Sequence, residues 1–223
     1  MEIFLASNNA HKHRELAPFF PGAALVLPRD RGIPFGPEET GNTFGENCLL
    51  KARSLYALVK APVLADDSGL CVDILGGAPG IYTSRYGGKD FPRGLPGGAK
   101  LPQEEQNRLL IEHVNEALRL NPDGAARWGR SCRFVCALAL YLGDDRFVLV
   151  QETMEGLLVE TPEAARGAGG FGYDPVVVVQ GLEKTAAELA PEEKKARSHR
   201  GRAARRLSEF FKNEAVRNGE SCR

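Results

Sequence analysis

Two carboxylates stand side by side in the segment LADDSGL, residues 64–70, directly after an apolar run. Asp66 and Asp67 repel each other when both are ionised, and a divalent cation or a shared proton relieves that repulsion. Because alternate residues of an extended chain face opposite sides, we expect only one of the two to face a ligand. Carboxylate oxygens suit Mg²⁺, which takes one or two protein carboxylates and fills its other positions with water and substrate phosphate. The pair therefore indicates a candidate magnesium site.

A second acidic pair is the candidate for the other carboxylate of such a site. Glu38 and Glu39 lie in the segment PEETGNTF. The alternative interpretation is that both glutamates are solvated, while Asp66, Asp67 and Ser68 form an Asx turn. Spacing alone leaves both interpretations open.

The segment SNNAHK, residues 7–12, has the composition of an anion-binding site. It follows the apolar run EIFLA and places a hydroxyl, two amides and Lys12 at the start of a predicted helix. Unpaired backbone N–H groups and the positive end of the helix dipole favour an anion there. The segment lacks the glycines of GxxxxGK[ST], so it is not a P-loop. A helix cap followed by a surface lysine is the alternative.

Aromatic residues in FGYDP, residues 171–175, offer a surface for a nucleobase. Phe171 and Tyr173 could stack on a ring, and Asp174 could accept a hydrogen bond from a ring N–H. The alternative is an aromatic pair packed in the core beside a tight turn.

Basic residues concentrate between 194 and 206, with His199 among them. Apolar Ala203, Leu207 and Phe210 recur at helical spacing, which indicates an amphipathic helix with its basic face outward. This pattern favours a solvated face with a few residues recruited to phosphate over a nucleic-acid groove binder. Together with the acidic, anion-binding and aromatic segments, it fits one ligand, a nucleoside triphosphate with Mg²⁺.

Alternating strands and helices must position these residues, which indicates an α/β or α+β protein with a mixed sheet. We predict strands at 2–6, 62–65 and 176–179 and a hairpin over 131–156, and helices after Asn8 or Asn9, after Thr43, over 104–120 and after Ser198. Thr43 and Glu46 form a predicted capping box. The residues from 76 to 100 are rich in glycine and proline, which predicts a mobile surface loop.

Composition limits the classes of protein to which the chain can belong. The 223 residues carry 29 basic and 29 acidic side chains, so no global field attracts nucleic acid or a membrane surface. No apolar run approaches the roughly 20 residues that span a bilayer, and the N-terminus lacks a basic signal region, so we expect a cytoplasmic protein. The five cysteines lack CxxC spacing and are interpreted as buried free thiols.

Taken in order, motifs over nearly the whole chain resemble the inosine triphosphatase family, also called the XTP/dITP pyrophosphatases. These motifs are Ser7-x-Asn9-x-x-Lys12-x-x-Glu15, Glu38-Glu39-Thr40-Gly41-x-Thr43-Phe44-x-x-Asn47 with Lys51-Ala52, ADDSGL from Ala65, GGAPGIYTSRYGG from Gly76, GGFGYDP from Gly169, TAAEL from Thr185, and Glu193-Lys194 to Ser198-His199-Arg200-Gly201. His11 and Cys48 depart from the usual pattern, as does an insert at 89–102.

The resemblance implies a single two-lobed α/β domain over residues 1–223, with a long mixed β-sheet and two α/β lobes flanking a central active-site cleft. It implies a homodimer that hydrolyses dITP, ITP and XTP to the monophosphate and pyrophosphate with Mg²⁺, cleansing the nucleotide pool without binding nucleic acid or membrane. We expect a disordered tail from about residue 214.

The resemblance also implies a role for individual residues. Asp67 would be the general base and, with Glu39, a metal ligand. The implied substrate contacts are Ser7, Asn8, Asn9, Ala10, His11, Lys12, Lys51, Ser68, Phe171, Gly172, Tyr173, Asp174, Lys194, His199 and Arg200. The last two are expected near the purine.

Overall fold

The computed structural model of the chain describes residues 1–87 and 101–217, with side chains described as far as residue 210. The described chain divides into two compact units. Unit 1 comprises residues 1–67, 136–152 and those from 195 onward, whereas unit 2 comprises residues 68–135 and 153–194.

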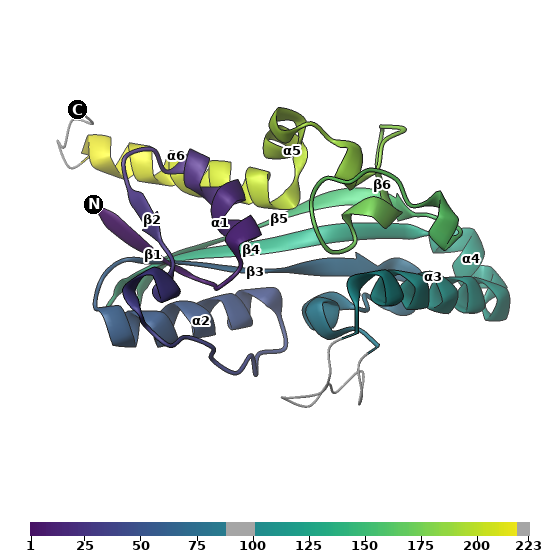
Figure 1. Cartoon of the computed structure of the whole chain (residues 1–223), viewed down its shortest axis with the longest axis horizontal. Coiled ribbons are helices and arrows are strands. Elements are labelled where there is room, and N and C mark those ends of the chain that lie inside the picture. The colour runs from purple at the N-terminus through teal and green to yellow at the C-terminus, as the bar shows by residue number, and fades with distance from the viewer. Residues whose placement is uncertain (88–100, 218–223) are drawn as a thin grey trace. The chain divides into compact units, whose positions relative to one another are not determined.

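Six strands form one sheet in the order β2-β1-β3-β4-β5-β6 (Figure 1). They are β1 (Glu2–Ala6), β2 (Ala24–Val26), β3 (Val63–Val72), β4 (Ser131–Gly143), β5 (Arg146–Leu158) and β6 (Val177–Val179). Strand β1 pairs in parallel with β2 and with β3, whereas β5 pairs antiparallel with β6. The predicted α/β fold with a mixed sheet is confirmed.

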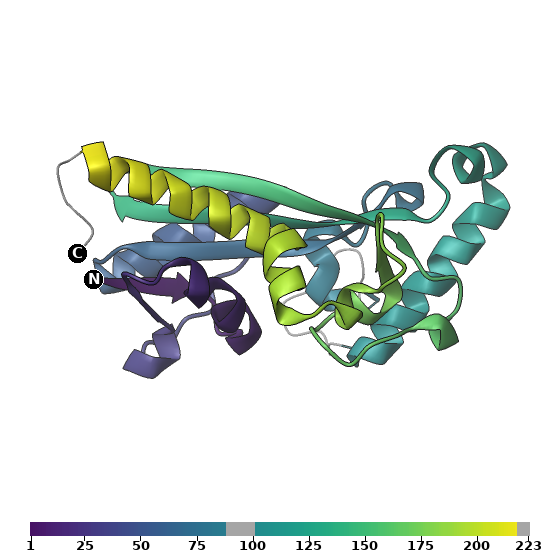
Figure 2. The same cartoon turned by 90° about the horizontal axis from the view of Figure 1, so that it is seen from above.

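Helices cover both faces of the sheet within unit 1. Helix α2 (Phe44–Val59) lies on one face, while α1 (Ala10–Leu16) and α6 (His199–Arg217) lie on the other (Figure 1). Helix α6 runs along the hairpin strands β4 and β5 (Figure 2). Apolar side chains of α1, α6 and the strands that they cover form the unit 1 core, which includes Leu5, Leu16, Leu64, Leu138, Ala203 and Leu207.

Side-chain caps start these helices where the sequence predicts. Asn9 caps α1 by accepting from the His11 backbone N–H at 2.8 Å, and Ser198 accepts from the Gly201 N–H at 3.0 Å at the start of α6. Thr43 caps α2, accepting from the Glu46 N–H at 3.1 Å. The capping box is only half formed, because the Glu46 carboxylate accepts from the Asn42 N–H rather than from Thr43.

Strand β3 corrects the expectation that the buried strand ends at the two aspartates. It runs unbroken from Val63 to Val72, so Asp66 and Asp67 lie inside a strand instead of in a turn. The physical reason is that each carboxylate finds cations on its own side of the sheet, as described below, and therefore needs no turn to reach water. The Asx-turn alternative is wrong for the same reason.

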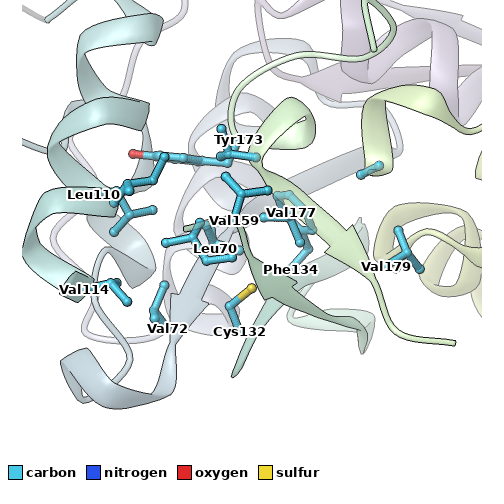
Figure 3. Close-up of a cluster of buried hydrophobic side chains, with 14 of the residues drawn as sticks. Leu70, Val72, Leu110, Val114, Cys132, Phe134, Val159, Tyr173, Val177 and Val179 are labelled. Atoms are coloured by element: carbon cyan, nitrogen blue, oxygen red, sulfur yellow. The ribbon is translucent and has the colours of Figure 1, made fainter. Parts of the chain in front are cut away.

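Unit 2 packs its core between strand ends and helix α3 (Gln103–Leu120). Leu70, Leu110, Val114, Phe134 and Tyr173 are all buried in one apolar cluster (Figure 3). Two helices were not predicted from the sequence: α4 (Pro122–Trp128), capped by Asn121, and α5 (Pro191–Arg197). Short 3₁₀ turns occupy Ala17–Phe19, Pro28–Arg31, Asp73–Leu75, Gly80–Arg85, Pro162–Ala164, Asp174–Val176 and Ala186–Glu188.

The hairpin between β4 and β5 is confirmed, and its turn is tight. Asp144 and Asp145 connect the strands with φ of 49° and 54°. Two successive positive φ values are typical of the type I′ turn, whose twist matches that of the flanking strands.

Residues 76–87, the described part of the glycine-rich stretch, are more ordered than the sequence predicts. Residues 80–85 form a 3₁₀ turn, and Tyr86 is 1% exposed. An aromatic side chain buried in the core fixes the chain on either side of it, which composition alone did not reveal. Residues 88–100, most of the predicted insert, lie outside the described residues.

The prediction of free thiols is confirmed at the described positions, and that of burial at three of them. Cys48, Cys132 and Cys136 are buried free thiols and Cys71 is a half-buried one, whereas Cys222 lies outside the described residues.

Helix α6 continues to Arg217, so the first residues of the expected disordered tail are helical and its remainder, from 218, lies outside the described chain. Within the described residues, no helix combines the length and apolar character needed to cross a membrane.

Candidate active site

Strand register brings the predicted anion-binding segment to the two aspartates. In the parallel pair of β1 and β3, Ala6 is opposite Ala65. The segment that leaves the sheet after β1, starting with Ser7, therefore lies beside Asp66, the next residue of β3. Ligands bind beyond the carboxyl ends of strands in open α/β sheets, so this is the candidate site of unit 1.

Asp66 is the centre of a buried ion cluster on the α1 and α6 face. Its carboxylate pairs with the Lys12 ammonium, and its Oδ2 accepts from the Arg200 Nε at 2.7 Å. Arg200 also donates to Glu15 Oε2 at 2.5 Å, and the Cys136 thiol lies 3.4 Å from Asp66 Oδ2. Burial opposes ionisation here, but the charges of Arg200 and Lys12 prevail and hold the pKa of Asp66 well below its usual value.

Asp67 faces the opposite side, toward helix α2. Its Oδ1 accepts from the Lys51 ammonium at 2.5 Å, and the same nitrogen donates to Glu39 Oε1 at 2.9 Å. Two carboxylates are thus gathered around one cation. Burial raises the pKa of Asp67, and the charge of Lys51 only partly offsets that rise. A carboxylate with a raised pKa is better suited to accept a proton near neutral pH than an ordinary one.

Helix α2 also holds the segment that carries Glu39. Asn47, one turn before Lys51, accepts from the Gly41 backbone N–H at 2.8 Å through its Oδ1. The Asn47 side chain is fully buried, and its Nδ2 has no hydrogen-bond partner among the described residues. A single helix therefore places both the lysine between the carboxylates and the loop from which Glu39 projects.

The segment 7–12 folds back on itself. Ser7 Oγ accepts from the Asn9 backbone N–H at 3.1 Å, and Asn8 donates through Nδ2 to the Phe35 carbonyl oxygen at 2.7 Å. Ala10 opens helix α1, and His11 Nδ1 lies 2.9 Å from an Arg14 guanidinium nitrogen. Of these residues, the structure brings Lys12 directly to an aspartate, Asp66.

The aromatic segment in unit 2 is organised by Asp174. Its Oδ2 accepts from the Phe171 backbone N–H at 2.8 Å and from the Lys194 ammonium at 2.8 Å. Lys194 Nζ also stands 5.6 Å from the centre of the Phe171 ring, a cation–π distance. Gly172 has a φ of +66°, which a residue with a side chain rarely adopts. The Tyr173 ring is 4% exposed and belongs to the apolar core.

The remaining predicted residues divide between the units. Ser68 follows Asp67 in β3 and belongs to unit 2. His199 begins helix α6 in unit 1 and is 5% exposed, beside the buried Arg200. The structure therefore brings together Lys12, Asp66 and Arg200, and separately Glu39, Lys51 and Asp67, in unit 1. It brings together Phe171, Asp174 and Lys194 in unit 2.

The basic face of α6 has a structural partner. Arg202 and Arg206 both pair with Glu152 on β5, at 3.4 Å and 2.7 Å. A basic helix face that pairs with an acidic side chain of the same chain is expected of a solvated surface helix. The pairing agrees with the interpretation that α6 does not bind in a nucleic-acid groove.

Sequence reasoning missed three residues of these clusters. Glu15 and Asn47 were noted only as motif positions, and no cation partner was predicted for Asp66. The spacing of Lys12 and Glu15, one turn apart on α1, and that of Asn47 and Lys51 on α2 were the available signals. Neither spacing names the third partner. Arg200 lies 185 residues from Glu15, and the Gly41 N–H is a backbone group that leaves no side-chain signal in the sequence.

The donor set around Lys51 suits a hard cation. Glu39 and Asp67 supply carboxylate oxygens only, and two such ligands are what Mg²⁺ commonly takes from a protein. The described residues contain no group of three or more histidine, cysteine or acidic side chains that could enclose a metal. A metal at this place would thus depend on substrate oxygens and water for its remaining ligands.

Comparison with known families gives a match over most of the chain. Residues 3–210 match the model of the Ham1 family. A dITP/XTP pyrophosphatase of Treponema denticola is 47% identical over 215 residues, which cover 95% of this chain and 99% of the relative. A dITP/XTP pyrophosphatase of Geobacillus kaustophilus is 40% identical, with 93% of each chain covered.

Solved structures agree with the sequence comparison. A HAM1 protein from Coxiella burnetii superposes with a TM-score of 0.79 at 34% identity, covering 96% of this chain and 99% of the other. The Ham1 protein of Staphylococcus aureus gives a TM-score of 0.74 at 32% identity, covering 96% of this chain and all of the other.

Proposed function

The chain belongs to the Ham1 family, and from this premise we propose that it is a nucleoside triphosphate pyrophosphatase that hydrolyses dITP and XTP to the monophosphate and pyrophosphate. The observation that carries the proposal is the gathering of Asp67 and Glu39 around the Lys51 ammonium. Attack of water on a phosphate requires a proton acceptor and positive charge close together, and this cluster supplies both. ITP is a further proposed substrate.

Asp67 is the proposed general base. It would take a proton from the water that attacks the α-phosphorus, and the pyrophosphate would leave with the electrons of the broken P–O bond. Its raised pKa, caused by burial, favours this transfer near neutral pH. Lys51 holds one oxygen of the carboxylate and so orients the other.

Mg²⁺ is the proposed cofactor, held by Glu39 and Asp67. When bound there, it would neutralise charge on the phosphate oxygens. Lys12 and Lys51 add positive charge on either side of β3, and residues Ser7 to His11 offer hydroxyl, amide and backbone donors to the triphosphate. Positioning and charge neutralisation account for most of the catalysis of phosphoryl-type transfer.

Base selection is proposed to rest on Phe171, Asp174 and Lys194, with Ser68, Gly172, Tyr173, His199 and Arg200 contributing. Phe171 offers a ring face, while the carboxylate and ammonium at Asp174 and Lys194 offer an acceptor and a donor. A site built for a 6-keto purine leaves a polar group unpaired when the 6-amino group of adenine enters, and this difference produces discrimination.

A homodimer is the proposed assembly, and an apolar surface on β5 supports it. Phe147 and Leu149 lie two residues apart on one face of the strand and are 40% and 39% exposed. Contiguous exposed apolar surface is a feature of interaction sites, and these two side chains are the candidate contact. Light scattering that gives a monomer mass at micromolar concentration would contradict the dimer. A cytoplasmic location and the absence of nucleic-acid binding stay predictions.

One assay tests the proposed function. The purified protein is incubated with Mg²⁺ and dITP, and pyrophosphate and orthophosphate are measured separately. We expect pyrophosphate and dIMP in equal amounts, and no turnover after chelation of the metal. Release of orthophosphate would instead indicate a phosphomonoesterase, and binding without turnover would indicate a nucleotide-binding module.

A further inference from the structure

Helix α3 carries a buried polar residue at a position where its neighbours are apolar. Gln106 is 0% exposed and shares the buried side of the helix with Leu110, Ile111 and Val114. Burying an amide costs free energy unless both of its ends are hydrogen-bonded. Both ends are bonded here: Nε2 donates to the Leu101 carbonyl oxygen at 2.8 Å, and Oε1 accepts from a tyrosine hydroxyl.

That hydroxyl belongs to Tyr173, in the segment proposed to recognise the base. Its oxygen lies 3.4 Å from Gln106 Oε1 and 3.2 Å from the Thr83 carbonyl oxygen, so its one proton is shared between two acceptors. Figure 3 shows the Tyr173 side chain directed toward the helix that carries Leu110 and Val114. The ring is thus fixed by α3, and its role is to hold the segment in place.

A second amide on α3 holds the neighbouring residue of the same segment. Asn107 Nδ2 donates to the Gly172 carbonyl oxygen at 3.4 Å. The Asn107 amide is itself oriented from one helical turn earlier, because its Oδ1 accepts from Gln103 Nε2 at 3.0 Å. Successive residues Gly172 and Tyr173 are therefore each bonded to successive residues of α3.

The segment needs this support for a physical reason. Gly172 has a positive φ, and a glycine loses more conformational freedom on folding than any other residue. Phe171 and Asp174 stand on either side of this flexible point and bond to each other. Asp174 Oδ2 accepts from the Phe171 N–H at 2.8 Å, and the Asp174 N–H donates to the Phe171 carbonyl oxygen at 3.4 Å. Neither of these bonds involves the Gly172 carbonyl oxygen, so the bond from Asn107 is the one that ties this peptide to α3.

We propose that Asn107, oriented by Gln103, is a positioning residue for base selection, while Gln106 holds the adjacent Tyr173. Asn107 sets the path of the Gly172 peptide and so the places of Phe171 and Asp174. The inference rests on the proposed function of this segment in base recognition. Selectivity depends on placement within a fraction of an ångström, and a displacement of about 1 Å lowers the reaction rate about 10²-fold.

The test compares Asn107→Ala and Asn107→Asp with a matched control on the same helix. Asn107→Asp keeps the acceptor for Gln103 but loses the donor to Gly172. The control is Asn115→Ala, because Asn115 also donates from α3 to a backbone carbonyl oxygen, that of Glu160, at 3.2 Å. The readout is the ratio of kcat/KM for dITP to kcat/KM for dATP, with the melting temperature measured in parallel.

We expect this ratio to fall about 10-fold or more in both Asn107 variants, and to stay unchanged in Asn115→Ala. A merely structural role would lower activity toward both nucleotides together and leave the ratio unaltered. An unchanged ratio in the two Asn107 variants would overturn the proposal.

Hydrogen exchange separates this inference from the proposed function. Mass spectrometry of the peptide that contains Phe171 to Asp174 should show exchange at least several-fold faster in Asn107→Ala than in wild type or Asn115→Ala. Equal exchange rates would overturn the positioning role, whether or not the protein is active. If wild type is inactive on dITP while Asn107→Ala still exchanges faster than wild type, the proposed function is overturned instead.

Discussion

Asp66 and Asp67 are neighbours in strand β3, yet their carboxylates face opposite sides and pair with different cations. Asp66 is bound by Lys12 and Arg200, and Asp67 by Lys51. The alternation of a β-strand separates the two carboxylates, so their pKa values move in opposite directions: that of Asp66 falls and that of Asp67 rises. One aspartate is thus suited to a structural ion cluster and the other to proton transfer.

Replacement of Asp67 tests the proposed base. Asp67→Asn should lower kcat for dITP by about 10²-fold or more, because an amide cannot accept the proton. Full activity of Asp67→Asn would remove Asp67 from the mechanism.

The adjacent pair Glu38 and Glu39 provides a second comparison. Glu39→Gln should raise the Mg²⁺ concentration needed for half-maximal activity, whereas Glu38→Gln, at an exposed position, should not.

Asn47 tests how the Glu39 segment is held. Asn47→Leu removes the acceptor for the Gly41 N–H, so Glu39 should be less well placed and the Mg²⁺ requirement should rise. Asn47→Asp is the matched control, because it keeps an oxygen for that N–H. A magnesium titration that gives the same midpoint for Asn47→Leu and wild type would contradict this role.

The buried ion cluster should contribute strongly to stability. Asp66→Asn leaves Arg200, which is 2% exposed, with one carboxylate instead of two. Breaking a buried pair by removing one partner costs about 3–5 kcal/mol, and urea unfolding measures it. Glu116→Gln, which breaks an exposed pair with Arg119, serves as the control and should have no measurable effect.

Acid should remove the stabilisation from this cluster. The pKa of Asp66 in the folded protein lies below its value in the unfolded chain, because Arg200 and Lys12 outweigh the effect of burial. Its contribution is therefore complete above the unfolded value of 3.8 and is lost as pH falls through the folded value. The free energy of unfolding should decline more steeply below about pH 5 in wild type than in Asp66→Asn. Equal slopes of the free energy of unfolding against pH in wild type and Asp66→Asn, below about pH 5, would contradict this account.

The described thiols should resist modification in the folded protein. Burial raises the pKa of Cys48 and of Cys132 to about 12, and that of Cys71 to about 11. The thiolate is the reactive form, so a Cys222→Ser protein should react slowly with a disulfide reagent at pH 8 and release four equivalents only in denaturant. Rapid reaction of any thiol under native conditions would count against the buried arrangement.

Local patterns predicted much of the fold because their causes are local. The Asn9, Thr43 and Ser198 caps were readable, since a cap needs only the side chain and the backbone within three residues. Strand β3 was predicted too short because two charges inside a strand contradict the usual pattern, and the cations that compensate them lie far along the chain. Helix α4 was missed because Asn121 and Pro122 were interpreted only as the stop of α3, although proline is also favoured at the first turn of a helix.

The candidate site likewise has a part that the sequence predicted and a part that it did not. Residue types and motif order by themselves predicted a nucleoside triphosphate as the ligand. Strand alternation predicted that the two aspartates face opposite sides, since it follows from backbone geometry alone. Only the tertiary structure decided which cations each aspartate meets, that Arg200 is buried between Asp66 and Glu15, and that α3 supports the Gly172 peptide. Arg200 lies 134 residues from Asp66 and Gly172 lies 65 from Asn107. Contacts over such separations are set by how the strands and helices pack, and no local spacing encodes them.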